Sequence, residues 1–115
     1  MHLNLLVIKT NNPEKLASQY KKLGLTFTHH QHGKGPWHYS TQIGSTVFEI
    51  YPLPKSVSVA DSTTRLGFSV DDLDKFIYSL ADTNWKIISP PNRTSWGYSA
   101  IIQDIDGRKI ELTCE

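Results

Sequence analysis

The amino-acid sequence of 115 residues predicts an α+β fold made of two copies of a βαβββ module. Each half of the chain opens on a short apolar run that is followed by a capped amphipathic helix. Three further runs of strand-like composition follow in each half, separated by turns that contain glycine or proline. The last run of each half carries one glutamate between apolar neighbours, Glu49 and Glu111.

In the first half, the apolar run at 3–8 is short enough to be a strand that is buried on both faces. The segment Asn12-Pro13-Glu14 is typical of a helix N-terminus and Gly24 of a C-terminus, which predicts a helix over about 13–23. The remaining strands of this half are expected at 25–32, 37–43 and 46–51, with a turn at 33–36.

The second half repeats this order after a connecting loop at 55–63. A strand at 65–70 precedes a helix that Asp71 or Asp72 caps, with an apolar face made of Leu73, Phe76, Ile77 and Leu80. The remaining strands of this half are expected at 85–89, 98–103 and 108–113, with Pro90-Pro91 ending the first and a hairpin turn at Asp106-Gly107 before the last.

Length and composition indicate one globular domain, with module one at about 1–54 and module two at about 64–115. Hydrophobic residues make up 38% of the chain and charged residues 20%. A net charge of +1 gives no drive toward nucleic acid or an anionic membrane. We expect no signal peptide, because the N-terminal residues lack the basic region, apolar stretch and cleavage site of one, and no apolar run approaches membrane-spanning length. Cys114 is the single cysteine. A cytoplasmic protein is therefore expected.

Strand alternation indicates which side of the sheet each glutamate occupies. Glu49 shares a face with Tyr51, and Glu111 lies on the corresponding face of the last strand, together with Arg65 from the strand that opens the second half. The apolar residues that alternate with these polar ones, on the opposite face of each strand, are expected to pack under the helices. The spacing leaves open whether the polar face is simply solvated or lines a cleft.

Four segments resemble the vicinal oxygen chelate superfamily, which includes glyoxalases, extradiol dioxygenases and bleomycin resistance proteins. They are Leu5 to Leu25, Val47 to Tyr51, Leu66 to Asp71, and Asp104 to Leu112 with its aspartate-rich turn before an apolar-Glu-Leu strand. The resemblance implies two βαβββ modules whose curved, mixed sheet lines a cleft, with the helices on the outer face. It also implies a homodimer. Of the two possibilities for the polar face, it favours a cleft that contains both glutamates.

In metal-dependent members of this superfamily, the first and last strands of each module supply four ligands. Glu49 and Glu111 suit that role, but the two remaining positions hold Leu5 and Arg65, which cannot bind a cation. An arginine between two carboxylates supplies positive charge in place of the ion. We therefore expect Arg65 to pair with Glu49, Glu111 or both, and no metal cofactor. The alternative is a divalent metal ion held by Glu49 and Glu111.

Four histidines crowd one segment, at positions 29, 30, 32 and 38, and such a cluster suggests metal binding, although its spacing matches no known motif. A turn at 33–36 predicts that His30 and His32 share a face with Trp37 and Tyr39, while His29 and His38 point the other way. One interpretation is a partly exposed hairpin in which histidines cover aromatic neighbours. The other is that His38 supplies a hydrogen-bonding group or a general base to the cleft.

We expect the cleft to bind a small, partly aromatic or cationic molecule without a metal, as in the bleomycin resistance branch. The expected ligand-binding residues are Glu49, Arg65, Glu111, Tyr51, His38 and Trp96. The alternative is a metal-dependent enzyme of the glyoxalase type, a lyase, isomerase or dioxygenase, with Glu49 and Glu111 as ligands. Neither interpretation identifies catalytic residues or the ligand.

Overall fold

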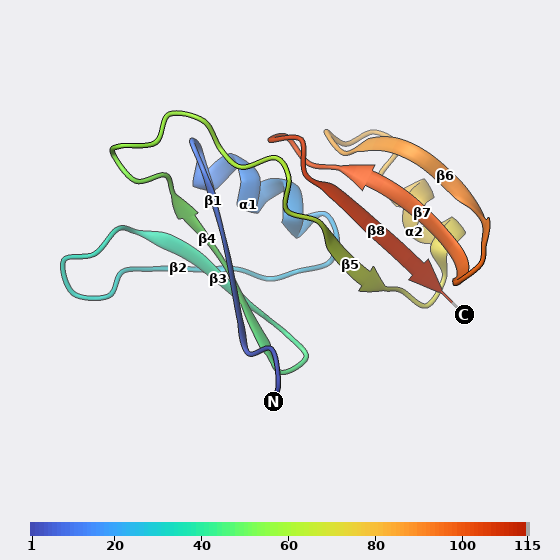
Figure 1. Ribbon diagram of the computed structural model, residues 1–115, viewed down its shortest axis with the longest axis horizontal. Coiled ribbons are helices and arrows are strands. Elements are labelled where there is room, and N and C mark those ends of the chain that lie inside the picture. Colours follow the sequence, from blue (N-terminus) through green and yellow to red (C-terminus); the bar gives the residue numbers. More distant parts are fainter. Residues whose placement is uncertain (115) are drawn as a thin grey trace. The chain divides into compact units, whose positions relative to one another are not determined.

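The computed structural model describes residues 1–114, which form two four-stranded mixed sheets and two helices (Figure 1). The chain divides into two compact units, Met1–Asp61 and Ser62–Glu115, and this division falls within the loop expected at 55–63. Each unit has the order strand, helix, strand, strand, strand, so the predicted α+β fold of two βαβββ modules is confirmed.

The first unit contains one helix on a sheet of strand order β1-β4-β3-β2. Strands β1 and β4 are parallel, whereas β4, β3 and β2 pair antiparallel. The elements are β1 (Leu5–Thr10), α1 (Pro13–Lys21), β2 (Thr28–His30), β3 (His38–Ile43) and β4 (Thr46–Pro52).

The second unit repeats this topology with the order β5-β8-β7-β6. Its first and last strands, β5 and β8, are again the parallel pair. The elements are β5 (Leu66–Ser69), α2 (Leu73–Ser79), β6 (Lys86–Thr94), β7 (Gly97–Gln103) and β8 (Lys109–Cys114).

Side-chain caps begin both helices where the sequence predicts them. The Asn12 side-chain oxygen accepts a hydrogen bond from the Lys15 N–H at 3.1 Å, and Asp72 accepts one from the Lys75 N–H at 3.2 Å. These bonds satisfy amide groups that have no partner within the helix. Asp72 is thus the cap of α2. Among the described residues, no helix is long and apolar enough to cross a membrane.

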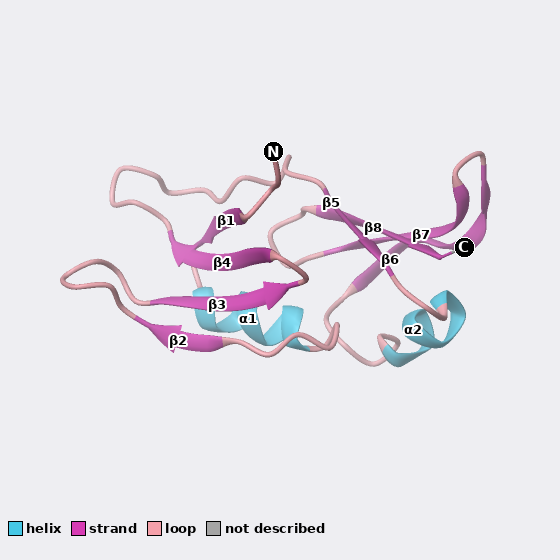
Figure 2. Ribbon diagram, turned by 90° about the horizontal axis from the view of Figure 1, so that it is seen from below, coloured by secondary structure: helices cyan, strands magenta, loops and turns pink. Residues whose placement is uncertain are grey.

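Strand alternation separates an apolar face from a polar face in each sheet. Phe48 and Ile50 of β4, and Ile110 and Leu112 of β8, are buried, as predicted. In the first unit α1 covers the apolar face of the sheet, and Tyr20 of that helix packs against the Phe48 ring at 5.4 Å between centroids (Figure 2). The two glutamates consequently lie on the faces that their own helices do not cover.

The strand expected at 25–32 is shorter than predicted, since β2 comprises only Thr28–His30. The following loop is closed by hydrogen bonds from the Gly35 N–H to the His32 carbonyl at 2.9 Å and from the Gln31 amide to the Gly35 carbonyl at 2.7 Å. Pro36 has no N–H with which to continue the ladder. The hairpin connection therefore runs from 31 to 37 instead of from 33 to 36.

Strand β6 extends through Pro90-Pro91, which we expected to end it. This strand lies at the edge of its sheet, so one side of its backbone needs no ladder hydrogen bonds. The pairing with β7 also shifts register between Ile87 and Ser89 and again between Ser89 and Asn92. Prolines are tolerated at such bulged edge positions.

The turn before β8 contains a fully buried guanidinium. Arg108 Nη1 lies 3.2 Å from Asp104 Oδ2 and 3.0 Å from Asp106 Oδ2, and the Asp104 carboxylate also accepts the backbone N–H groups of Asp106 and Arg108. Gly107 completes the turn with a φ of 95°, a conformation that glycine adopts without strain. Charge pairing therefore supports the turn predicted at Asp106-Gly107.

We predict that Arg108→Ala lowers the free energy of unfolding by about 3–5 kcal/mol, because Asp104 loses a charged partner inside the protein. Denaturant unfolding of the full chain measures this change. The matched control is the exposed neighbour Lys109, whose replacement by alanine changes stability by less than about 0.5 kcal/mol. A loss below about 1 kcal/mol for Arg108→Ala would contradict the assigned role of this ion pair.

Candidate functional site

The polar face of the first sheet brings four donor side chains together. His30 of β2 lies opposite His38 of β3, and Ser40 lies opposite Glu49 of β4. Because residues two apart on a strand share a face, His38 and Glu49 are diagonal neighbours on the same side. We call His30, His32, His38 and Glu49 the imidazole cluster. Its four potential ligand atoms all lie within 4.8 Å of one another.

Distances within the imidazole cluster are shortest at Glu49. Its Oε2 lies 3.4 Å from His38 Nε2 and 4.0 Å from His30 Nε2. The three imidazole rings stand 4.5–5.0 Å apart between centroids. His38 is buried, with 1% of its side chain exposed, whereas His30 is 41% exposed. The cluster thus has a buried floor and an outer side that reaches solvent.

Two neighbours fix the orientation of the His38 ring. Its Nδ1 lies 3.1 Å from the Pro36 carbonyl oxygen, which can only accept a hydrogen bond. Nδ1 is therefore the protonated nitrogen of the neutral ring, and the Nε2 lone pair points toward Glu49. Tyr51 stacks on the ring at 4.1 Å and an interplanar angle of 9°, and its hydroxyl lies 3.3 Å from Nε2.

The predicted distribution of the hairpin histidines was wrong. His30, His32 and His38 share one face, whereas His29 lies opposite Tyr39 and stacks on it at 4.3 Å between centroids. The error arose because the connection is three residues longer than the predicted turn, which changes the residue that faces His38. His29 thus packs against Tyr39 and Trp37, the latter at 5.0 Å between centroids, whereas His38 stacks on Tyr51.

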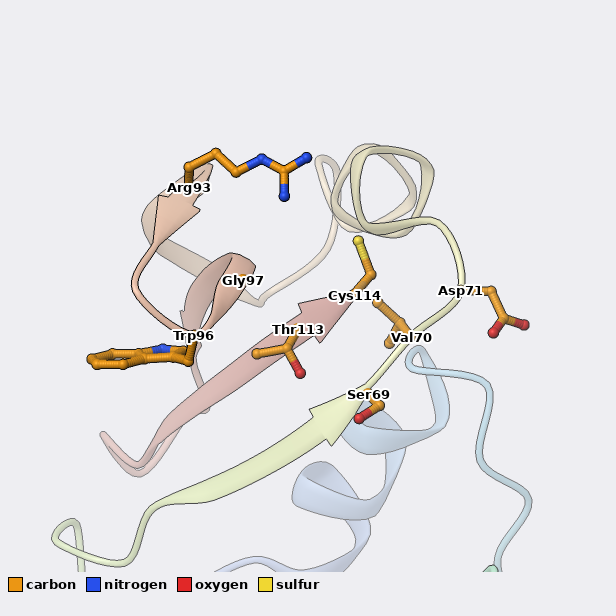
Figure 3. A pocket seen from close by; sticks show the side chains of 8 residues that line it. All are labelled: Ser69, Val70, Asp71, Arg93, Trp96, Gly97, Thr113 and Cys114. Carbon is orange, nitrogen blue, oxygen red and sulfur yellow. The ribbon is translucent and has the colours of Figure 1, made fainter.

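A second candidate site is a cavity of about 530 Å³ within the second unit (Figure 3). It is formed where β5 ends, where the β6–β7 turn reverses and where β8 ends. Its lining residues are Ser69, Val70, Asp71, Arg93, Trp96, Gly97, Thr113 and Cys114. This volume falls within the range of small-molecule sites.

The cavity takes a cationic side chain from the end of β6 and an aromatic side chain from the β6–β7 turn. Trp96 is 68% exposed, which is unusual for so large an apolar side chain. The Arg93 guanidinium carbon lies 5.4 Å from the Tyr98 ring centroid, and the Tyr98 hydroxyl donates to Asp74 at 2.7 Å. Figure 3 shows the Asp71 carboxylate pointing away from the other lining side chains. Arg93 is therefore the positively charged group of a lining that also includes Asp71.

The six residues predicted to bind ligand are distributed over both units. Glu49, Tyr51 and His38 lie together in the first unit, and Trp96 lines the cavity of the second. Glu111 lies opposite Gly67, and Arg65 is exposed just before β5. Within the described part of the second unit, Arg65 forms no ion pair with Glu111. The pairing of Arg65 with Glu49 stays a prediction.

Sequence reasoning did not predict that Arg93 lines the cavity or that His30 and His32 lie beside Glu49. Arg93 follows Pro90-Pro91, where the strand was expected to end. Strand alternation could therefore not predict which side of the sheet Arg93 occupies. The His-x-His spacing was visible at positions 30 and 32. Only the register of the hairpin, however, reveals that Glu49 completes the set.

Comparison with known families identifies the class of protein. The model of the Glyoxalase/Bleomycin resistance protein/Dioxygenase superfamily matches residues 2–112. The chain belongs to this superfamily, as its sequence resemblance indicates. A comparison with curated proteins found no match.

Solved structures from several bacteria share the fold. TnmS3, an antibiotic-binding protein from Streptomyces sp. CB03234, is similar with a TM-score of 0.81 and 21% identity, over 99% of this chain and 95% of that one. A family enzyme from Burkholderia phytofirmans PsJN has a TM-score of 0.78 and 16% identity, covering 99% and 98%. A hypothetical protein from S. aureus has a TM-score of 0.77 and 18% identity, covering 100% and 97%.

The residues at the ligand positions of metal-dependent members do not fit a metal ion as a set. Leu5 has no donor atom and is half exposed, and Arg65 is a cation. Glu49 is instead surrounded by imidazoles from its own module. The donor set around Glu49 thus differs from that of the superfamily's metal-dependent members.

We predict that Glu49→Gln lowers the pKa of the Tyr51 phenol. Burial raises this pKa above 10.0, and the negative charge of Glu49 raises it further because it opposes the phenolate. Removing that charge brings the pKa closer to its usual range but leaves the effect of burial. A ¹³C NMR titration of labelled tyrosines, assigned with Tyr51→Phe, measures the change. An unchanged or higher pKa would contradict the proximity of the two groups.

Proposed function

We propose that this protein binds a small aromatic molecule, with Trp96 as the stacking surface and without a requirement for a metal ion. The observation that supports this most strongly is the exposed indole at the cavity of about 530 Å³ in the second unit. Concave sites with aromatic walls and a few polar groups are typical of small-molecule binding. The antibiotic-binding function of TnmS3, a neighbour in fold, is consistent with it.

The charge of the lining narrows the ligand class. The sequence favoured an aromatic or cationic molecule in a pocket with acidic residues and an arginine. Arg93 lines the cavity, whereas the Asp71 carboxylate points away from the other lining groups (Figure 3). A guanidinium binds carboxylates and related anions through paired hydrogen bonds. We therefore propose an aromatic ligand that carries an acidic group.

The remaining sequence predictions form part of the same proposal. Glu49, Tyr51 and His38, together with Arg65 and Glu111, are proposed to contact ligand from the polar faces of the two sheets. A homodimer and a cytoplasmic location are proposed on the superfamily resemblance. The other function, a metal-dependent lyase, isomerase or dioxygenase using Glu49 and Glu111, is an outcome of the experiment below.

We predict that 2-naphthoate, but not 2-naphthylmethylammonium, shifts the Trp96 indole N–H signal in ¹⁵N NMR spectra of the EDTA-treated protein. The two probes have the same ring system and opposite charge, so the difference reports Arg93. The signals of Trp37, exposed in the first unit, and Trp85, which is 4% exposed, serve as internal controls. Trp96→Ala weakens naphthoate binding about tenfold, and Trp37→Ala leaves it unchanged.

The variant Arg93→Ala loses the discrimination between the two probes and retains a Trp96 shift. Two results would contradict the proposal. One is a naphthoate complex that leaves the Trp96 signal unperturbed. The other is naphthoate binding that appears only when a divalent metal is added and disappears in both Glu49→Gln and Glu111→Gln, which would support the metal-dependent alternative.

A further inference from the structure

We propose that the imidazole cluster, His30, His32, His38 and Glu49, is a binding site for a divalent transition-metal ion such as Zn²⁺, Ni²⁺ or Cu²⁺, which we call a zinc-class ion. This site lies entirely within the first module. It shares only Glu49 with the ligand positions of the superfamily's metal-dependent members. The inference does not rest on the proposed aromatic ligand, because the observations that support it concern the first unit alone, whereas Trp96 and Arg93 lie in the second. Glu49 and His38 are the residues that the two proposals share.

The donor atoms already converge to nearly the required separation. Zn²⁺ binds imidazole nitrogen and carboxylate oxygen at roughly 2.0–2.2 Å, which places the ligand atoms of a tetrahedral site roughly 3.3–3.6 Å apart. Glu49 Oε2 and His38 Nε2 are 3.4 Å apart, and Glu49 Oε2 and His30 Nε2 are 4.0 Å apart. All four potential ligand atoms lie within 4.8 Å of one another. Side-chain rotations that move these atoms by about an ångström would therefore bring all four within bonding distance of one ion.

The tautomer of His38 favours a metal ion or a proton between its Nε2 and the Glu49 carboxylate. Its Nδ1–H donates to the Pro36 carbonyl, so the neutral ring presents a lone pair to the Glu49 carboxylate. Two acceptors that face each other at 3.4 Å repel unless positive charge lies between them. The Tyr51 hydroxyl, 3.3 Å from Nε2, can donate a hydrogen bond to this nitrogen but supplies no positive charge to Glu49. A backbone carbonyl on the second ring nitrogen is also the usual support of a metal-bound histidine.

His30 supplies an independent observation. Its Nε2 is buried and has no hydrogen-bond partner among the described residues, although part of the ring is exposed. Buried polar atoms without a partner are rare in native proteins, and a bound ion is one reason for their occurrence. This nitrogen lies toward Glu49 in the same cluster. A metal ion would satisfy His30, His38 and Glu49 at once.

The donor types select the class of metal. Three imidazoles and one carboxylate suit Zn²⁺, Ni²⁺ or Cu²⁺, whereas Mg²⁺ and Ca²⁺ prefer oxygen ligands. The exposed His32 lies on the solvent side of the cluster, and the buried His38 forms its floor. An ion can therefore enter from solvent without disturbing the hydrophobic core on the opposite face of the sheet, which includes Phe48 and Ile50.

Isothermal titration of the EDTA-treated full chain with ZnCl₂ tests the proposal. We expect one ion per chain with a micromolar or lower Kd, a rise in Tm with Zn²⁺, and no such response to MgCl₂. His32→Ala, at an exposed position, and the isosteric Glu49→Gln weaken Zn²⁺ binding by about tenfold or more. Their circular dichroism spectra and metal-free Tm confirm that the fold is retained.

Matched controls distinguish this site from zinc binding elsewhere on the chain. His29→Ala removes a histidine of the same hairpin from the opposite face and leaves the affinity unchanged. Glu111→Gln is also expected to leave it unchanged, because the first module supplies all four proposed ligands. Absence of stoichiometric uptake would overturn the proposal and indicate a hydrogen-bonded hairpin without an ion. Uptake that is abolished by Glu111→Gln, or unaffected by His32→Ala and Glu49→Gln, would overturn it as well.

Discussion

The register between β3 and β4 is the constraint on which the candidate chemistry of the first module depends. Ser40 lies opposite Glu49, and Thr41 opposite Phe48. Burial of Phe48 and Ile50 beneath α1 holds this register, because a slip by one residue would expose both and bury the carboxylate. The same apolar contacts that stabilise the sheet therefore direct Glu49 toward the histidines. Packing on the apolar face of the sheet thus determines which side chains lie together on its polar face.

Duplication of the βαβββ module has given two similar backbones with different side chains at equivalent positions. Glu111 occupies in β8 the place that Glu49 occupies in β4. In the first unit the neighbouring row across the sheet is His30, His38 and Tyr51; in the second unit it is Asn92, Ser99 and Thr113. Only the first module thus offers nitrogen ligands beside its glutamate in the described chain. The second module instead carries a cationic group, Arg93, near the end of β6 and an aromatic group, Trp96, on the turn that follows.

Local sequence signals predicted most of the fold. Asn12 and Asp72 begin their helices because their side chains satisfy free amide groups, and the alternation of Phe48, Glu49 and Ile50 assigns the two faces of β4. The candidate site was less predictable because it depends on pairing between strands. A hairpin connection three residues longer than predicted changed the neighbours of His38, and an edge strand that tolerates Pro90-Pro91 placed Arg93 at the cavity. Such features follow from tertiary pairing, which the local pattern does not encode.

Within its own module, Glu49 has imidazoles as its neighbours, and a zinc-class ion would join them into one site. The most direct measurement is a crystal structure of the protein grown with Zn²⁺, with anomalous data collected on both sides of the zinc absorption edge. We predict one strong peak within bonding distance of His30, His32, His38 and Glu49. A peak shared by Glu49 and Glu111, or Glu49 paired with Arg65 and no zinc bound at the cluster, would contradict this assignment.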